Sequence, residues 1–427
     1  MNTASARNIS LRRQSILRMA LAAALTMTSA CRESDSSLAD SPAVTSVVNS
    51  NTEFALDLYQ QLKTRPGNLF FSPFSISTSL AMTYAGARGQ TENEMAKTLH
   101  LSLPQQDLHM AYGKLTAWLG KVQNGNRVVL ATANSLWCQQ EYRFTDSFLN
   151  IARTQYRADI QSVDFKNAAE SARAEINSWV EQKTKGRIKD VVAPNQFTSD
   201  TLMVLCNAVY FKGTWQKQFD PKRTKSLPFV TNGDNYVDVP MMDVTSKFTT
   251  FHAQNFNFKA IADNFKAIVL PYAGGDFSMI VFLPDTYDGL PNLERRLNAD
   301  NLHKWIAELD QTPKHTVSVR LPRVKITQEF QLVKVLSTLG MPSAFSLDAD
   351  LTGMSSVKPL FLSDSVHKAF VEINEEGTEA AAATAHIASR SQGDSFLADH
   401  PFIFLIRENR SGSILFIGRV SDPSKES

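Results

Sequence analysis

Three groups of residues in this sequence have types that could support catalysis. Glu375 and Glu376 are adjacent carboxylates of the kind used in general acid–base chemistry. Adjacent residues on a strand point to opposite faces, so this pair would not converge on one substrate. His367 lies in a strand-like segment, which favours a hydrogen-bonded core histidine over a catalytic one. Gly274 and Gly275 separate two apolar runs, which favours a tight turn over a phosphate-binding loop.

The larger catalytic motifs are missing. The sequence holds no G-x-S-x-G, no P-loop, and no G-x-G-x-x-G before a helix. It also has no Cys-x-x-Cys and no histidine cluster at metal-ligand spacing, so we expect no metal and no cofactor. Cys138 and Cys206 lie in apolar runs and are predicted to be buried free thiols, with a disulfide between them as the alternative. Nothing here indicates an enzyme.

Composition narrows the class of protein further. The chain has 427 residues, with 44 Lys and Arg against 42 Asp and Glu, a net charge of +2. This balance excludes a polycationic nucleic-acid-binding protein and an acidic disordered chain. A mean hydropathy of −0.21 excludes a polytopic membrane protein. The composition hardly changes over residues 49–423, which predicts one large domain with an ample core.

The first 48 residues have the pattern of an exported protein. Four arginines lie within the first 18 residues, the first acidic residue is Glu33, and residues 19–30 are small and apolar. We therefore predict a signal peptide over residues 1–30. Ser29 and Ala30 before Cys31 resemble a bacterial lipoprotein cleavage box, which predicts a lipidated Cys31 and a tether to the outer membrane. The alternative is ordinary cleavage near Ala30 and release into the periplasm or medium. Residues 31–48 are polar and small, as in a flexible tether.

Helix signals dominate the first half of the chain and strand signals the second. We predict helices from residue 51, over 74–85, over 91–99 with Thr91 as the cap, and over 168–185. We predict strands over 202–211 and 317–321, and hairpins 267–271/277–283 and 402–407/414–420. The expected fold class is α+β with large antiparallel or mixed sheets.

Residues 375–401 form an unusually long connection between two strand-like segments. With a period of two, Thr378, Ala380, Ala382 and Thr384 share one face, which carries neither bulk nor charge. Glu379, Ala381, Ala383 and Ala385 share the other face. Such a segment can remain an exposed loop and convert later to a strand, because alanine is not a strong strand former. Periodicity alone equally permits an alanine-rich helix or a plain linker.

Four motifs of this chain, in the family's order, resemble the serpins. E-E-G-T-E-A-A-A-A-T at 375–384 closely resembles the hinge of the serpin reactive-centre loop, and F-L-A-D-H-P-F-I-F-L-I at 396–406 resembles the signature that follows that loop. The segment 207–215 resembles a central strand of the main sheet, and 68–77 resembles the segment beneath its opening point.

The resemblance implies the serpin fold, with three β-sheets, surrounding helices and an exposed reactive-centre loop at about 375–400. It also implies a monomeric suicide inhibitor of serine proteases whose cleaved loop inserts into a sheet while the protease is covalently attached. The implied hinge comprises Glu375, Glu376, Gly377, Thr378, Glu379, Ala380, Ala381, Ala382, Ala383 and Thr384. The implied sheet-opening region comprises Ser72, Ser75, Asn207 and His367, with Trp215 at the point of first insertion.

The position of the scissile bond sets the expected target. Counting back from 401–402 gives Arg390–Ser391, which we prefer and which predicts a trypsin-like protease. Counting forward from Glu375 gives Ser391–Gln392, which would suit an elastase-like or subtilisin-like enzyme. The alternative function is a non-inhibitory carrier or chaperone with the serpin fold, which the small uncharged hinge disfavours. The basic residues at 222, 223 and 225 are expected to be a solvated face, so we predict no polyanion cofactor.

Overall fold

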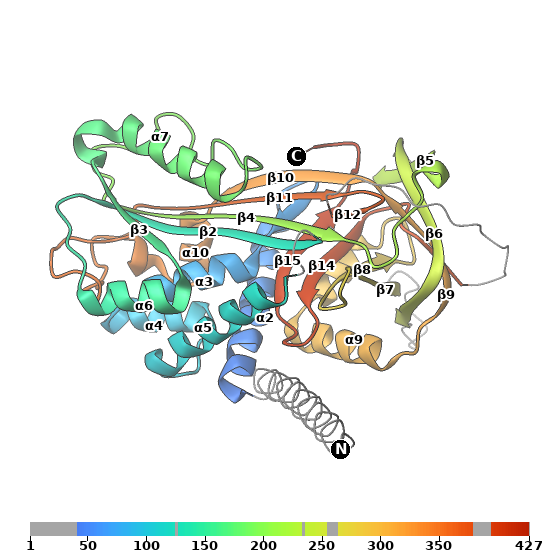
Figure 1. Cartoon of the computed structure of the whole chain (residues 1–427), viewed down its shortest axis with the longest axis horizontal. Helices are drawn as coiled ribbons and strands as arrows, with labels where there is room; N and C mark the ends of the chain where they lie inside the picture. Colours follow the sequence, from blue (N-terminus) through green and yellow to red (C-terminus); the bar gives the residue numbers. More distant parts are fainter. Residues whose placement is uncertain (1–40, 124–126, 233–234, 254–263, 379–393, 427) are drawn as a thin grey trace, which may run out of the picture.

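The computed structural model describes residues 41–123, 127–232, 235–253, 264–378 and 394–426. Helices predominate in the first half of the chain and strands in the second, and the α+β class predicted from the sequence is confirmed (Figure 1). The described helices are α2 (Pro42–Leu62), α3 (Pro73–Tyr84), α4 (Gly89–Thr98), α5 (Gln105–Lys121), α6 (Asp146–Tyr156), α7 (Phe165–Lys183), α8 (Leu290–Arg296), α9 (Ala299–Gln311) and α10 (Val333–Leu339). None of these helices is both long and apolar enough to span a bilayer.

The first sheet has six strands in the order β10 (Val324–Gln331), β11 (Asp364–Ile373), β12 (Gly377–Thr378), β4 (Met203–Thr214), β2 (Val128–Gln139) and β3 (Asp159–Val163). Strand β11 also pairs directly with β4. Helix α7 covers one face of this sheet, and α3, α5 and α6 lie on the other (Figure 1). Both faces of β4 are therefore buried, which explains its long apolar run.

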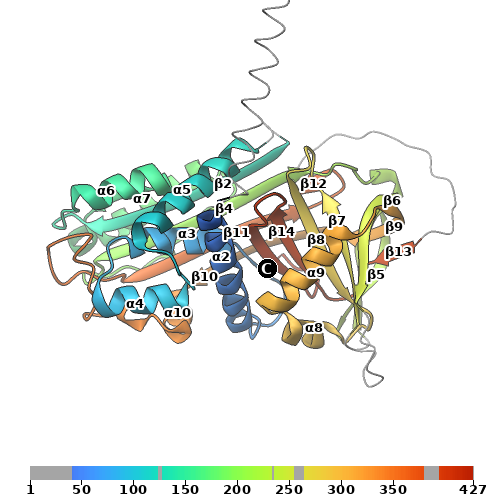
Figure 2. The ribbon, with the colours of Figure 1, turned by 90° about the horizontal axis from the view of Figure 1, so that it is seen from below.

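The remaining strands form a nine-stranded assembly of two sheets that share the long strand β6. Strands β1 (Leu69–Phe71), β15 (Ile414–Val420), β14 (Phe402–Glu408), β8 (Phe277–Pro284) and β7 (Phe265–Pro271) lead to the long β6 (Asn235–Ala253). The earlier part of β6 pairs with β5 (Lys225–Asn232) and with β9 (His315–Pro322), which in turn pairs with β13 (Asp394–Leu397). With the six-stranded sheet this gives the expected three sheets. Figure 2 shows α8 and α9 beside the β7–β8 region.

Both predicted hairpins are confirmed. Strands β7 and β8 pair antiparallel, as do β14 and β15. The core between β1, β14 and β15 is aromatic: the Phe70 ring stacks on Phe416 with centroids 5.2 Å apart and on Phe404 at 5.9 Å. All three rings are fully buried, so this sheet is held by close apolar packing.

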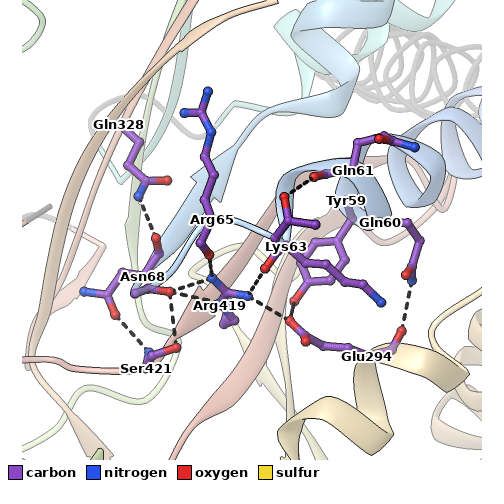
Figure 3. Close-up of polar contacts among 12 residues, drawn as sticks. Tyr59, Gln60, Gln61, Lys63, Arg65, Asn68, Glu294, Gln328, Arg419 and Ser421 are labelled. Atoms are coloured by element: carbon purple, nitrogen blue, oxygen red, sulfur yellow. Dashed lines mark hydrogen bonds and ion pairs between the residues drawn. The ribbon is translucent and has the colours of Figure 1, made fainter. Parts of the chain in front are cut away.

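A polar hub fixes the end of the β15 hairpin strand to helices α2 and α8 (Figure 3). The Arg419 guanidinium donates to the carbonyls of Lys63 (2.9 Å) and Gly67 (3.0 Å) and to the Glu294 carboxylate (3.1 Å). The Tyr59 hydroxyl donates to the same carboxylate at 2.8 Å. Because these buried charges are paired and hydrogen-bonded, the hub holds elements that are far apart in the sequence.

The structure corrects three details of the sequence prediction. Helix α2 begins at Pro42, so residues 42–48 are helical and not part of a flexible tether, and the helix does not start at residue 51. Val44, Val47 and Val48 are buried by the roughly two and a half extra turns. Helix α4 begins at Gly89 with Arg88 at its cap, so Thr91 as the cap was wrong. The Thr91 hydroxyl instead accepts a hydrogen bond from the Asp350 amide at 3.0 Å.

Cys138 and Cys206 are buried and free, as predicted, and the alternative disulfide is contradicted. Cys138 belongs to the main apolar core, whereas Cys206 belongs to the core beneath α7. The two side chains thus lie in different layers. Burial raises the pKa of each thiol to about 12, so both are inert.

Candidate functional site

The candidate site is the junction between β4 and β11 in the six-stranded sheet. These strands pair in parallel over residues 364–370 and 204–210. Their outer neighbours pair with them antiparallel, β2 with β4 and β10 with β11. At the far end β4 and β11 separate, and the two residues of β12 lie between them, antiparallel to both. The sheet therefore already accommodates the start of an additional central strand.

Four of the predicted residues meet beneath this junction. His367 and Asn207 are directly opposite each other on β11 and β4, and the imidazole Nδ1 is hydrogen-bonded to the Asn207 side-chain oxygen. The Asn207 amide donates to the Ser75 hydroxyl at 2.6 Å, and the His367 Nε2 accepts from the Ser72 amide at 3.1 Å. We call Ser72, Ser75, Asn207 and His367 the junction cluster.

Local sequence explains how Ser72 and Ser75 reach the junction. Ser72 is the N-cap of α3, and its hydroxyl accepts a hydrogen bond from the Ser75 amide at 3.2 Å. Pro73 fills the first helical position, where its missing N–H is harmless. Helix α3 is buried along its whole length and carries small hydroxyl residues, so it can approach the sheet closely.

The junction cluster is structural and has no hydrolytic chemistry. Its hydrogen bonds place the imidazole proton on Nδ1 and use the Nε2 lone pair to accept from a backbone amide. The Ser72 hydroxyl donates to the Leu415 carbonyl at 2.7 Å, so it faces no base. Burial lowers the pKa of His367 to about 3, which keeps the ring neutral. A general base needs a free lone pair toward a nucleophile, and His367 has none.

Trp215 lies apart from the junction cluster, at the entrance where β4 and β11 separate. Its indole N–H donates to the Asn374 carbonyl at 2.9 Å, and its amide donates to the Glu376 carbonyl at 2.8 Å. Its ring stacks on Tyr272, with centroids 4.7 Å apart and planes at 8°. Trp215 thus holds the chain just before β12 against the end of β4.

The two hinge residues of β12 fit closely into the sheet. The Thr378 side chain is fully buried, and its hydroxyl is hydrogen-bonded to the Tyr272 hydroxyl at 2.8 Å. This matches the inward face predicted for Thr378. A Cβ at Gly377 would lie 1.9 Å from the Gly213 carbonyl oxygen, so only glycine permits this approach.

The two glutamates before β12 have different environments and do not form a catalytic pair. The Glu375 carboxylate accepts from Arg323 at 2.6 and 2.9 Å and from the Thr224 hydroxyl. Burial would raise the pKa of Glu375, but these hydrogen bonds outweigh it and the net shift is downward. Partial burial raises the pKa of Glu376, with Lys212 acting in the opposite direction. The hydrogen bonds of Glu375 to Arg323 and Thr224 therefore hold the start of the hinge in place.

The remaining predicted residues lie outside the described part of the chain. These are Cys31, Glu379, Ala380, Ala381, Ala382, Ala383, Thr384, Arg390 and Ser391. Sequence reasoning missed Arg323, Thr224 and Tyr272, which hold the hinge, and Asn134 and Ser79, which also bond the Asn207 amide. Ser79 lies in the helix predicted over 74–85 and Thr224 lies in the basic stretch at 222–225, but no sequence signal indicated that either side chain reaches the hinge or the junction cluster. Arg223, in the basic stretch interpreted as a solvated face, instead pairs with Asp243.

Comparison with known proteins identifies the class that this fold and junction define. The family model described as serpin (serine protease inhibitor) matches residues 49–423. The chain therefore belongs to the serpin family of serine protease inhibitors.

Several relatives are similar over nearly the whole domain. Leukocyte elastase inhibitor from Sus scrofa is 42% identical over 382 residues, covering 87% of this chain and 98% of that protein. The Homo sapiens leukocyte elastase inhibitor is 40% identical, covering 88% and 99%. Among solved structures, uncleaved ovalbumin superposes with a TM-score of 0.80 at 32% identity, covering 88% and 100%. A specific serpin of the insect Tenebrio molitor gives 0.78 at 32% identity, covering 90% and 99%.

Proposed function

We propose that this chain is a suicide inhibitor of serine proteases that acts by cleavage and insertion of its own loop. The observation that carries the proposal is the single parallel ladder between β4 and β11, with β12 already seated at its open end. A strand continuing from β12 would replace that one ladder by two antiparallel ladders. Parallel pairing is slightly less stable per residue, and a second ladder adds further hydrogen bonds.

The energy of this conversion is large enough to do mechanical work on an attached enzyme. About a dozen new ladder hydrogen bonds at about 1 kcal/mol net each would release on the order of 10 kcal/mol. The protease first forms an acyl-enzyme with the loop. Insertion then draws the protease away from its docking position, and a displacement of about 1 Å in its active site can slow deacylation about 100-fold.

The first hinge residues support insertion over simple cleavage. Gly377 and Thr378 already occupy inserted positions without a charge or a bulky side chain entering the sheet. The sequence continues this small, uncharged inward face through Ala380, Ala382 and Thr384. A non-inhibitory carrier with the same fold would need no such face, and it remains the alternative.

We infer that cleavage falls at Arg390–Ser391 and that the target is trypsin-like. Arginine before the scissile bond is recognised by a carboxylate in the protease's primary pocket. The second candidate is cleavage at Ser391–Gln392 by an elastase-like or subtilisin-like enzyme. The names of the relatives, leukocyte elastase inhibitors at 40–42% identity, favour this candidate.

One experiment separates these possibilities. The purified chain is incubated with trypsin and, in parallel, with elastase, and the products are examined by denaturing electrophoresis and N-terminal sequencing. We expect a covalent adduct that survives boiling in SDS, and a released peptide beginning at Ser391 with trypsin. A peptide beginning at Gln392 with elastase would favour the second candidate. Cleavage by both enzymes without any adduct would contradict inhibition.

We also propose that the protein is exported and attached to the outer membrane through lipidated Cys31. The support is the sequence alone: a basic start, a short apolar run and small residues before Cys31. Metabolic labelling with a radioactive fatty acid should mark the native chain but not Cys31→Ala. Equal labelling of both proteins would exclude this attachment.

A further inference from the structure

A cavity of about 400 Å³ lies between β6, β7, the end of α9 and the end of β14. It is separate from the β4–β11 junction, and the inhibitory function assigns it no role. Its volume is within the range of small-molecule sites. Its inner wall includes the buried side chains of Phe248 and Leu309, and its polar residues include Gln216 and Asn409.

The charges lining this cavity are mainly positive. Lys247, Lys314 and Arg407 contribute three cations, and Asp310 is the single carboxylate among the lining residues. The net charge of the lining is therefore +2, within a molecule whose whole chain carries only +2. Concave, low-dielectric walls strengthen the attraction that such cations exert on an anion.

Arg407 is buried and only partly satisfied by the protein. Its two terminal nitrogens donate to the Asp310 carboxylate, and its side chain is 5% exposed. Its Nε–H has no hydrogen-bond partner among the described residues. A buried donor without a partner is unfavourable, and more so on a charged guanidinium, so an acceptor on a ligand would stabilise the Arg407 Nε–H.

The two lysines have no structural role that explains them. Both are exposed, and within the described residues neither has an ion pair or a hydrogen bond. A cation near the end of α9 stabilises the negative end of the helix dipole. Arg407, through its ion pair with Asp310, already places a cation at that end of α9. The helix dipole therefore does not explain why Lys247 and Lys314 are positively charged.

We propose that this cavity binds a small soluble ligand carrying a phosphate or sulfate group. A dianion matches the net lining charge of +2, and its several oxygens can accept from both lysines and from the Arg407 Nε–H. The apolar wall at Phe248 and Leu309 would contact the uncharged part of the ligand. A cavity of this size admits a whole small molecule, which favours a soluble ligand over a lipid headgroup still anchored in a membrane.

The test measures binding of pyrophosphate to the full chain at low ionic strength by isothermal titration calorimetry. We expect saturable binding to one site. Lys247→Gln with Lys314→Gln should weaken it at least about tenfold, because the variant removes two charge-assisted hydrogen bonds to the anion. The control is Lys304→Gln with Lys334→Gln, which removes the same charge from exposed positions outside the cavity and should leave the affinity unchanged.

A third variant predicts a change of opposite sign. Asp310→Asn removes the only carboxylate of the lining and should tighten pyrophosphate binding severalfold. A thermal melt shows whether this variant is folded, and the exposed lysine variants carry the test if it is not. Absence of binding to the native chain, or equal weakening in the cavity and control variants, would overturn the proposal. Binding to phosphatidic acid vesicles with none to free pyrophosphate would overturn the assignment to a soluble ligand.

Discussion

The two large sheets of this protein are held together in opposite ways. At β1, β14 and β15 the strands are antiparallel and packed by stacked phenylalanines, with a hydrogen-bonded arginine hub at one end. At β4 and β11 the strands are parallel, and a polar cluster of serine, asparagine and histidine lies beneath them. Apolar packing favours one fixed arrangement, whereas hydrogen bonds between neutral groups can be exchanged for new ones when strands separate.

If the proposed insertion mechanism holds, this difference separates a part of the molecule that moves from a part that stays. The apolar sheet would then be a rigid frame that is the same before and after cleavage. The β4–β11 junction would be the place where the loop adds a strand. The following predictions test that division, beginning with the largest expected effect.

Thr378→Arg should abolish the covalent protease adduct and leave only cleaved product. The Thr378 side chain is fully buried beside Tyr272, and a charge there would be desolvated without a partner, at a cost of several kcal/mol. Electrophoresis after incubation with the protease measures the ratio of adduct to cleaved chain. Glu379→Arg, predicted on the opposite face, is the matched control and should retain the adduct. Adduct formation by Thr378→Arg would show that the hinge does not insert.

Phe416→Ala should lower the free energy of unfolding by about 3–5 kcal/mol. Its ring is fully buried against Phe70 and Phe211, so the substitution leaves a cavity in the apolar sheet. If that sheet is a fixed frame, the loss should be the same in the intact and the cleaved protein. Urea denaturation of both forms measures it. A loss confined to the intact form would place this sheet among the moving parts.

Arg323→Ala should release the hinge and lower stability by about 1–2 kcal/mol. It leaves the buried Glu375 carboxylate without its guanidinium, but Arg323 is 47% exposed, so solvent screening reduces the effect below that of a fully buried pair. Hydrogen exchange at the Trp215 and Phe219 amides, which donate to the hinge carbonyls, should accelerate. Arg320→Ala is the control, because Arg320 is 45% exposed and its partner Asp243 keeps Arg223. Unchanged exchange in Arg323→Ala would show that the Arg323–Glu375 ion pair does not hold the hinge.

Acidification should destabilise the native state through its buried neutral histidines. Burial lowers the pKa of His367 to about 3 and that of His109 to about 4, whereas an unfolded histidine titrates near 6.5. Below pH about 6.5 the unfolded state therefore binds protons that the native state does not. Each histidine should then contribute a loss of about 1.4 kcal/mol per pH unit, continuing toward its native pKa, with no contribution above pH about 6.5.

Urea midpoints between pH 7 and pH 5 test this slope. His367→Gln should remove the contribution of His367 to the pH dependence of the free energy of unfolding, and His109→Gln should remove the contribution of His109. His367 belongs to the junction cluster and His109 to the α5–α6 packing, so only the first substitution should also change the rate of loop insertion. An unaltered slope in both variants would mean that neither ring is protonated on unfolding.

Much of the fold could be predicted because local patterns dominate in long elements. The apolar run of β4, the hairpins around Gly274 and Gly412, and the length of α3 follow from composition and turn residues. The beginning of α2 was missed because its first residues are small and follow a polar stretch, which hid the i, i+3, i+4 spacing of Val44, Val47 and Val48; burial of these valines stabilises the start of the helix. Thr91 has the type and spacing of a cap, but tertiary contacts with Asp350 and Ser343 use its hydroxyl instead.

The sequence by itself determined the family, through four motifs that resemble the serpins, and it predicted the core position of His367 and the inward position of Thr378, because these two depend on residue type and period. Only the tertiary structure decided that Arg323 and Thr224 hold Glu375, that Tyr272 lies beneath Thr378, and that cations from three separate segments of the chain line one cavity. Those contacts join residues far apart in the chain. Their formation depends on the packing of whole sheets, which no local pattern encodes.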